Sequence, residues 1–259
     1  MTVLEVYLGG GLVIAGAMIV LWVISLIIHD SSIVDPFWGP GFVLAAAWYA
    51  YQGPGEGPAV WLALLLASIW GVRLGGFLLW RNWGEGEDFR YANWRSEAGP
   101  KWWWYSFFKV YLLQGALMWI ISVPLLMAQF NHRANLGPLE IMAVVLWLIG
   151  FSFEAGGDCQ LARFKANPDN RGMVLNTGFW RFTRHPNYFG DAMQWWAFFL
   201  FALGAGGWWT FYAPLIMTVL LLKVSGVVML EKTLVQTKPE YAEYIRRTPA
   251  FLPWFPKSN

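Results

Sequence analysis

A polar motif opens one of the long apolar stretches of this chain: Trp180-Arg181-Phe182-Thr183-Arg184-His185-Pro186-Asn187-Tyr188-Phe189-Gly190-Asp191. An ionisable side chain inside a bilayer costs about 2.5–3.5 kcal/mol on insertion scales unless it faces a cavity or a partner. Proline suits the first turn of a helix, because its missing N–H has no acceptor there. The motif therefore predicts a helix that begins at about residue 186 and whose mouth lines a polar pocket.

The composition around this motif is that of an integral membrane protein. Hydrophobic residues make up 57% of the 259 residues and charged residues 13%, whereas soluble domains carry about 25% charged residues. The one cysteine, Cys159, allows no internal disulfide and no multi-cysteine metal site, and the net charge of +2 gives no support to nucleic-acid binding. We expect no metal, no nucleic-acid partner and no protein partner; the expected partners are membrane lipid and a lipophilic small-molecule substrate.

Seven apolar stretches are candidates for membrane-spanning helices, each of which needs about 20 residues. They cover about 5–29, 37–52, 59–80, 104–129, 137–156, 187–206 and 208–230. The weakest division falls at Gly204-Ala205-Gly206-Gly207, where one long apolar region must be split in two. The predicted fold is all-α, a single seven-helix transmembrane domain over residues 1–259 in which 238–259 form a cytoplasmic interfacial tail.

Lysine and arginine are distributed unevenly among the predicted loops. One set of loops and the tail hold Arg81, Arg90, Arg95, Lys101, Arg163, Lys165, Arg171, Arg181, Arg184, Lys232, Lys238, Arg246, Arg247 and Lys257, and the opposite set holds only Arg133. Basic residues are enriched in cytoplasmic loops. We therefore expect the N-terminus outside and the C-terminus in the cytoplasm.

The helix after the motif carries polar groups on one face. Its side chains at helical spacing fall within about 100° of one another; they are Arg184, Asn187, Tyr188, Asp191 and Trp195. The preceding helix ends in Glu154 and Asp158, and the loop after it carries Lys165, Asn167, Asp169, Asn170 and Arg171. Carboxylates and amides beside cations suit the ribose, adenine and phosphates of a nucleotide; the plainer interpretation is a solvated cytoplasmic loop.

A second polar stripe follows the third predicted span, in Trp70, Arg73, Phe77 and Arg81. Arg73 lies about two turns inside and needs a partner. Asp35 at the entrance of the second span is the expected one, and Gln114 in the fourth span can join them. The loop from Glu85 to Tyr91 is dense in charge and is expected to cover the cytoplasmic mouth. These residues form either a substrate site or a structural ion pair.

The chain resembles the bacterial DUF1295 family of the steroid 5-alpha-reductase superfamily. The residues that carry the resemblance are Gly178-Phe179-Trp180, the motif from Arg184 to Asp191 with Trp195, Ser32 to Gly39, Trp70 to Gly75 and Glu87 to Tyr91. The resemblance covers nearly the whole chain. It implies a seven-helix fold in a bacterial inner membrane, with NADPH in a cytoplasm-facing pocket and an enone in a lipid-accessible cavity.

The resemblance also implies site residues for an NADPH-dependent reductase of an unsaturated carbonyl, steroid-like or other lipid, acting on a CH–CH bond. The cofactor site is then formed by Asp158, Lys165, Asn167, Asn170, Arg171, Arg184, His185, Asn187, Tyr188, Asp191 and Trp195. Asp35, Trp70 and Arg73 are the implied catalytic residues. Trp70 stands where steroid reductases carry a tyrosine, and an indole N–H donates a hydrogen bond but is a poor proton donor.

Two other functions remain open on the same residues. Isoprenylcysteine carboxyl methyltransferases also carry Arg-His-Pro before a helix, an acidic pair after the last span and a Tyr-x-x-Tyr tail, which Glu231-Lys232, Tyr241 and Tyr244 resemble. Their cofactor is S-adenosylmethionine, which has no phosphate for the basic loop to bind. The third alternative is a non-enzymatic membrane protein that binds lipid.

Overall fold

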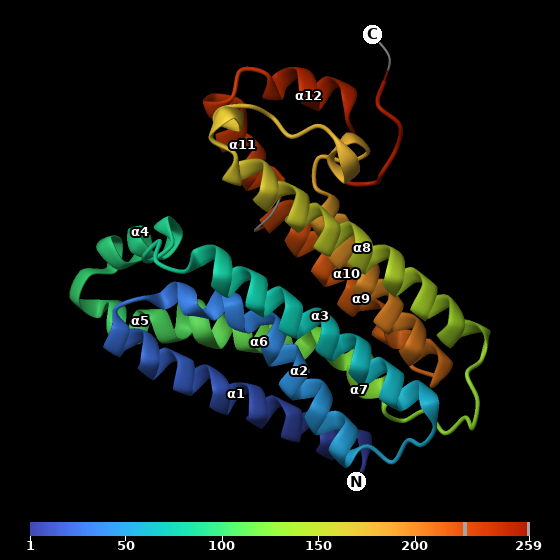
Figure 1. The fold of residues 1–259 in the computed structure, drawn as a ribbon. Helices are drawn as coiled ribbons and strands as arrows, with labels where there is room; N and C mark the ends of the chain where they lie inside the picture. Colours follow the sequence, from blue (N-terminus) through green and yellow to red (C-terminus); the bar gives the residue numbers. More distant parts are fainter. Residues whose placement is uncertain (225–226, 258–259) are drawn as a thin grey trace. The chain divides into compact units, whose positions relative to one another are not determined.

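The computed structural model describes residues 1–224 and 227–257, and every regular element within them is a helix (Figure 1). The all-α class predicted from the sequence is confirmed. Within these residues, four segments are long and apolar enough to cross a membrane, Val3–Ile28, Pro58–Asn82, Phe89–Ala128 and Pro138–Ala166, and a shorter apolar helical segment covers Trp208–Lys223. The chain is a multi-pass membrane protein. The last predicted span, 208–230, includes residues 225–226, which lie outside the described residues.

The helices form two compact units. Unit 1 comprises Met1–Gly137 and Phe201–Thr210, and unit 2 comprises Pro138–Leu200 and the chain from Phe211 onward. The helices of unit 1 are α1 (Val3–Ile28), α2 (Val34–Gln52), α3 (Pro58–Asn82), α4 (Phe89–Ala98), α5 (Trp102–Ser106), a π-helix (Phe107–Leu112), α6 (Leu113–Ile121) and α7 (Val123–Ala128).

Local sequence signals explain the beginning and the packing of the first helices. Thr2 and Glu5 form a reciprocal capping box at the start of α1, and His29 ends that helix in the left-handed conformation with φ of 57°. Where α2 crosses α3, a Cβ added to Gly39 would lie 2.3 Å from the carbonyl oxygen of Gly71. The backbones can approach this closely because both positions are glycine.

The fourth predicted span, 104–129, is not one continuous α-helix. The π-helix Phe107–Leu112 interrupts it, and α7 begins anew after α6. A π-helix bonds residue i to residue i+5, so it inserts an extra residue into the helical turn. Pro124 lies in the first turn of α7, where backbone N–H groups have no acceptor within the helix, so the missing N–H of proline costs no hydrogen bond. Hydropathy alone does not reveal either interruption, because the whole stretch is apolar.

Unit 2 contains two long helices and several shorter ones. They are α8 (Pro138–Ala166), α9 (Pro186–Gly204, whose last residues from Phe201 belong to unit 1), α10 (Tyr212–Val219), a π-helix (Leu220–Val224), α11 (Val227–Thr237) and α12 (Tyr241–Arg247). The helix predicted to begin at about residue 186 begins at Pro186. α8 extends ten residues beyond its predicted end at 156. Its last turn carries Arg163 and Lys165, whose positive charges interact favourably with the negative end of the helix dipole.

A second glycine pair lies where α8 crosses α9. A Cβ added to Gly190 would lie 2.3 Å from the carbonyl oxygen of Gly150. The predicted division near residue 204 is confirmed, since α9 ends at Gly204 and the next helical turn begins at Trp208. Gly206 has φ of 84°, a left-handed conformation that glycine adopts without strain.

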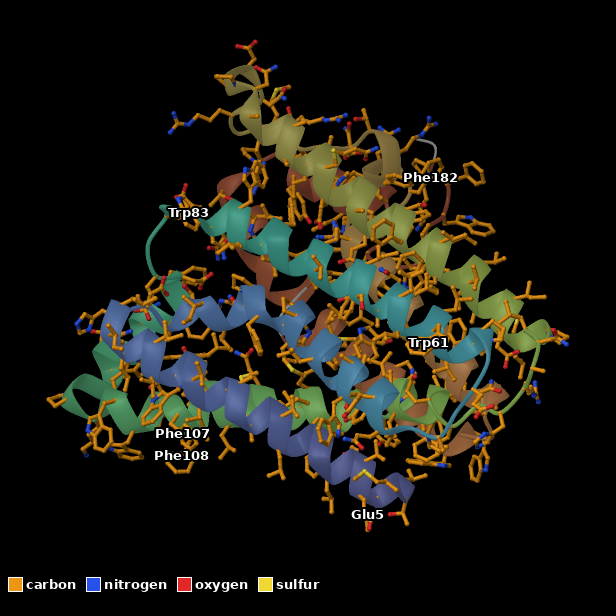
Figure 2. All side chains as sticks on the ribbon, turned by 60° about the horizontal axis from the view of Figure 1, so that its bottom comes forward. Glu5, Trp61, Trp83, Phe107, Phe108 and Phe182 are labelled. Carbon is orange, nitrogen blue, oxygen red and sulfur yellow. The ribbon has the colours of Figure 1, made fainter. Side chains whose placement is uncertain are left out.

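Large apolar side chains cover much of the surface. Among those labelled in Figure 2, Trp61 is 64% exposed, Trp83 77% and Phe108 55%. A soluble protein seldom exposes extended apolar patches, but lipid tails solvate such side chains well. The exposed faces therefore fit a bilayer environment.

Candidate functional site

In unit 1, Asp35 is the centre of a polar cluster. Its carboxylate accepts hydrogen bonds from Tyr91 OH at 2.6 Å and from Arg90 Nη2 at 2.7 Å. Gln114 Nε2 donates to the Tyr91 oxygen at 3.2 Å, so Gln114 joins the cluster as expected. Tyr91 is 3% exposed, whereas the Asp35 side chain is 21% exposed. The cluster thus holds a buried phenol between a carboxylate and an amide.

The start of α4 positions Arg90 and Tyr91. Asp88 caps this helix by accepting from the Arg90 backbone N at 3.0 Å, and its carboxylate also accepts from Arg90 Nε at 2.8 Å. Burial alone would raise the pKa of Asp88, but the hydrogen bonds from Arg90 outweigh it and the pKa is lowered. Glu87 fixes the same loop by accepting from the backbone N of Ser31 at 2.7 Å and from Arg95.

The other expected catalytic residues lie on α3. Trp70 is fully buried, with its ring 5.8 Å from that of Phe42. Arg73, the partner expected for Asp35, places its guanidinium over the Phe77 ring at 5.5 Å, and Arg90 is a cation bound to Asp35. Sequence analysis missed Tyr91 as a site residue and assigned it to a covering loop. The available signal was Asp88, an N-cap residue directly before Phe89-Arg90-Tyr91.

In unit 2, two of the predicted cofactor residues contact each other. Asn187 Nδ2, in the first turn of α9, donates to Asp158 Oδ1 on α8 at 3.1 Å. Asp158 is 5% exposed. One turn deeper, Glu154 is 2% exposed and accepts from the amide of Gln194. The glycine crossing of α8 and α9 brings these side chains within hydrogen-bond distance.

Arg184 and His185 are both bonded to Glu231 on α11. Arg184 Nε lies 2.7 Å and Nη2 3.1 Å from the Glu231 carboxylate oxygens, and His185 Nε2 lies 3.0 Å from Oε1. Arg184 Nη1 donates to the carbonyl oxygens of Ile245 and Thr248 in the tail. The guanidinium is therefore already satisfied by protein atoms, and the Arg-His pair anchors α11 and the tail to the start of α9.

The electrostatics of this anchor follow from its contacts. The side chains of Arg184, His185 and Glu231 are 8%, 4% and 18% exposed. Glu231 lies just beyond the last predicted span. Burial alone would raise its pKa, but hydrogen bonds from His185 and Arg184 and the charge of Arg184 lower it to about 2. Glu231 is therefore a carboxylate at neutral pH.

More tail contacts surround the motif. Tyr244 OH donates to the carbonyl oxygen of Trp180, and Thr183 Oγ1 donates to the carbonyl oxygen of Phe251 at 2.9 Å. Tyr188 stacks on the His185 ring with centroids 5.5 Å apart and planes 6° apart. The Arg-His-Pro motif and the tail thus form one packed layer at the mouth of α9.

The remaining predicted cofactor residues divide into buried and exposed groups. Asp191 and Trp195 are buried on α9, at 8% and 0% exposure. The predicted residues in the last turn of α8 and in the loop after it are mostly exposed. Lys165, Asn167 and Arg171 are exposed, and Asn170 is half-buried with its Nδ2 donating to the Phe164 carbonyl oxygen at 2.9 Å. Within residues 1–224 and 227–257, no group of three His, Cys, Asp or Glu side chains is placed to hold a metal ion.

Comparison with known proteins gives one family and a small set of relatives. Residues 21–248 match a family described as protein of unknown function, DUF1295. An uncharacterised protein of Schizosaccharomyces pombe is 26% identical over 70% of this chain and 60% of its own length. Delta(14)-sterol reductases of Schizosaccharomyces pombe and Mus musculus are 31% and 30% identical over 33% and 32% of this chain, and the matches cover 24% of each of them. No solved structure matches the chain.

Proposed function

Because this chain belongs to the DUF1295 family, and because it is similar to delta(14)-sterol reductases over about a third of its length, we propose that it is a membrane-embedded, NADPH-dependent reductase. Its substrate is a lipophilic molecule with a carbon–carbon double bond, conjugated to a carbonyl or a similar polar group. The observation that carries the proposal is the buried Tyr91 phenol of α4, which is held between Asp35 of α2 and Gln114 of α6.

The side chains of unit 1 suit the polar end of such a substrate. A carbonyl oxygen beside Tyr91 can take over the hydrogen bond that its OH makes to Asp35, and the phenol then polarises the carbonyl. Arg90 and Asp88 hold Asp35 in position, so they are positioning residues. Trp70 and Arg73 remain our expected lining of this site. The phenol takes the proton-donating role that an indole cannot fill.

The residues of unit 2 suit a phosphorylated nucleotide in part. The Asp158 carboxylate and Asn187 amide, together with Asn167 and Asn170, are able to bind ribose hydroxyls and base edges. Lys165 and Arg171 are exposed cations beside them and suit phosphates. When bound, NADPH supplies hydride chemistry. Arg184 and His185, which Glu231 and the tail already satisfy, would keep the mouth of α9 in shape; Tyr188, Asp191 and Trp195 complete the proposed site.

The proposal includes the topology. The chain would cross a bacterial inner membrane seven times as a single domain over residues 1–259, with the N-terminus outside and the C-terminus in the cytoplasm. The lysine and arginine distribution supports this orientation, because the loops on the side of Arg163 and Arg171 carry nearly all the positive charge. Soluble nucleotides are present on that side.

One observation favours S-adenosylmethionine-dependent methyl transfer as the second candidate. The three features shared with isoprenylcysteine carboxyl methyltransferases meet in unit 2: Arg184 and His185 bind Glu231, and Tyr244 binds the Trp180 carbonyl. These contacts suit a tail that closes over a cofactor in either enzyme class. They do not provide a phosphate site, and S-adenosylmethionine needs none.

Ligand-induced thermal stabilisation tests the proposal. A ligand at about 100 times its dissociation constant stabilises the folded state by about 2.7 kcal/mol. We expect NADPH to raise the melting temperature of the purified chain, and S-adenosylmethionine to leave it unchanged. Asn187→Ala should reduce the NADPH effect, while Asn176→Ala, at an exposed loop position of the same unit, should retain it. Stabilisation by S-adenosylmethionine alone would establish the second candidate, and stabilisation by neither ligand would favour a lipid-binding protein without enzyme activity.

A further inference from the structure

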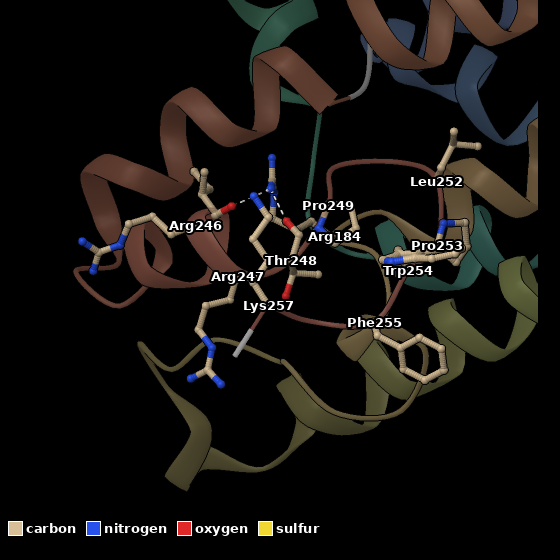
Figure 3. A pocket seen from close by; sticks show the side chains of 11 residues that line it. Arg184, Arg246, Arg247, Thr248, Pro249, Leu252, Pro253, Trp254, Phe255 and Lys257 are labelled. Atoms are coloured by element: carbon tan, nitrogen blue, oxygen red, sulfur yellow. Dashed lines mark hydrogen bonds between the residues drawn. The ribbon is translucent and has the colours of Figure 1, made fainter. Parts of the chain in front are cut away.

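A pocket of about 490 Å³ lies in unit 2 between α12 and the segment that follows it (Figure 3). Its lining combines cations and apolar side chains, among them Arg247, Thr248, Leu252, Trp254, Phe255 and Lys257. None of the described residues that line it is acidic. In Figure 3, Arg246 and Arg247 lie on one side of the pocket and Trp254 and Phe255 on the other.

The cations of this pocket are not equally neutralised. Arg184 is bonded to Glu231, and Arg246 pairs with Glu243 in an ion pair whose side chains are 75% and 46% exposed. The side chains of Arg247 and Lys257 have no acidic partner among residues 1–224 and 227–257. These two charges therefore remain available to an anion.

The apolar half of the pocket is exposed although the tail is fixed in place. Leu252, Trp254 and Phe255 are 69%, 73% and 70% exposed. The Trp254 backbone N donates to the Phe182 carbonyl oxygen at 2.9 Å, which ties the segment to the start of α9. Lys257 N likewise donates to the Arg247 carbonyl oxygen at 3.0 Å. The three apolar side chains are held outward at the mouth of a membrane helix.

We propose that this pocket binds the headgroup phosphate of an anionic phospholipid, with Trp254 and Phe255 in the bilayer interface. Tryptophan with nearby basic residues is the usual composition of a membrane–water interface. Anionic lipids of the cytoplasmic leaflet attract basic residues close to the surface, and this end of unit 2 is its basic end. A soluble phosphate would match the two charges but leave the three apolar side chains in water.

Competition between two lipids on the full chain tests this site. The purified protein in detergent is incubated with equal amounts of phosphatidylglycerol and phosphatidylcholine, and the bound lipid is measured by native mass spectrometry. The pocket variant is Arg247→Gln with Lys257→Gln. The matched control is Arg163→Gln with Arg181→Gln, which removes two exposed charges from the same end of unit 2, outside the pocket.

We expect phosphatidylglycerol to be preferred by the wild-type chain. The pocket variant should bind it about 30-fold more weakly, since each basic residue near an anionic surface contributes about a factor of five, and the control should bind it nearly as the wild type does. Equal losses in both variants, or equal binding of the two lipids, would overturn the proposal. So would displacement of the lipid by equimolar inorganic phosphate or NADPH, because the pocket would then be a site for soluble anions. If the double variant does not fold, Lys257→Gln alone is measured, with an expected loss of about fivefold.

Discussion

Glu231→Gln should destabilise the protein strongly, because it removes the carboxylate that neutralises Arg184 and that is hydrogen-bonded to His185. Removing one partner of a buried ion pair costs about 3–5 kcal/mol. Glutamine retains one oxygen that can accept a bond, and the Glu231 side chain is 18% exposed, so we expect the lower end, about 3 kcal/mol. For a protein of this size each kcal/mol changes the melting temperature by about 2–4 °C, which gives a decrease of about 6–12 °C.

The measurement is thermal loss of helical circular dichroism in detergent. Glu243→Gln is the matched control, since it makes the same substitution in the exposed pair with Arg246, where a surface ion pair contributes about 0.2–1 kcal/mol. A double variant tests the cause. Arg184→Met combined with Glu231→Gln should lose less stability than the sum of the losses in the two single variants, because no guanidinium is left without a partner. Equal melting temperatures for Glu231→Gln and Glu243→Gln would refute the reasoning.

Three more predictions follow from single contacts. Gly190→Ala should destabilise the protein by about 2–4 kcal/mol in thermal melts, because the added Cβ would lie 2.3 Å from the Gly150 carbonyl oxygen; Gly16→Ala, with nothing within 4 Å of its Cβ, should stabilise it by up to about 1 kcal/mol. Because the Glu231 pKa is lowered from 4.5 to about 2, its stabilisation is complete above about pH 5 and is lost as pH falls toward 2; a pH series of melts on wild type and Glu231→Gln should converge at low pH. Tyr91→Phe should reduce NADPH-dependent reduction by about 10²–10⁴-fold and leave NADPH-induced thermal stabilisation unchanged; a loss of both would place the phenol in cofactor binding.

Sequence reasoning located the helices better than it located the partners of their side chains. Apolar length and proline and glycine positions predicted a helix that begins at about residue 186 and a break around residues 204–207, and α9 runs from Pro186 to Gly204, because these signals act within a few residues. The π-helix Phe107–Leu112 was not predictable from hydropathy, since an inserted residue leaves an apolar stretch apolar.

The partners depend on contacts between distant parts of the chain. Asp35 and Tyr91 are 56 residues apart, and periodicity describes which face a residue occupies without describing which loop folds over that face. Depth alone suggested Arg73 as a partner for Asp35, but it did not reveal that the capped turn at Asp88 brings Arg90 to the same carboxylate. Glu231 was visible as an acidic residue after the last apolar stretch, but its bonds to Arg184 and His185 required the packing of α11 beside α9.

The anchoring of Arg184 also has a consequence for the order of events during synthesis. Its acceptors on Glu231, Ile245 and Thr248 lie 47, 61 and 64 residues later in the chain. If α9 crosses the membrane, as in the seven-span topology proposed above, the ribosome delivers it there well before the groups that bind Arg184 exist. Until then, Arg184 must remain in water or among lipid headgroups, which holds the start of α9 at the bilayer surface and favours the correct depth of insertion.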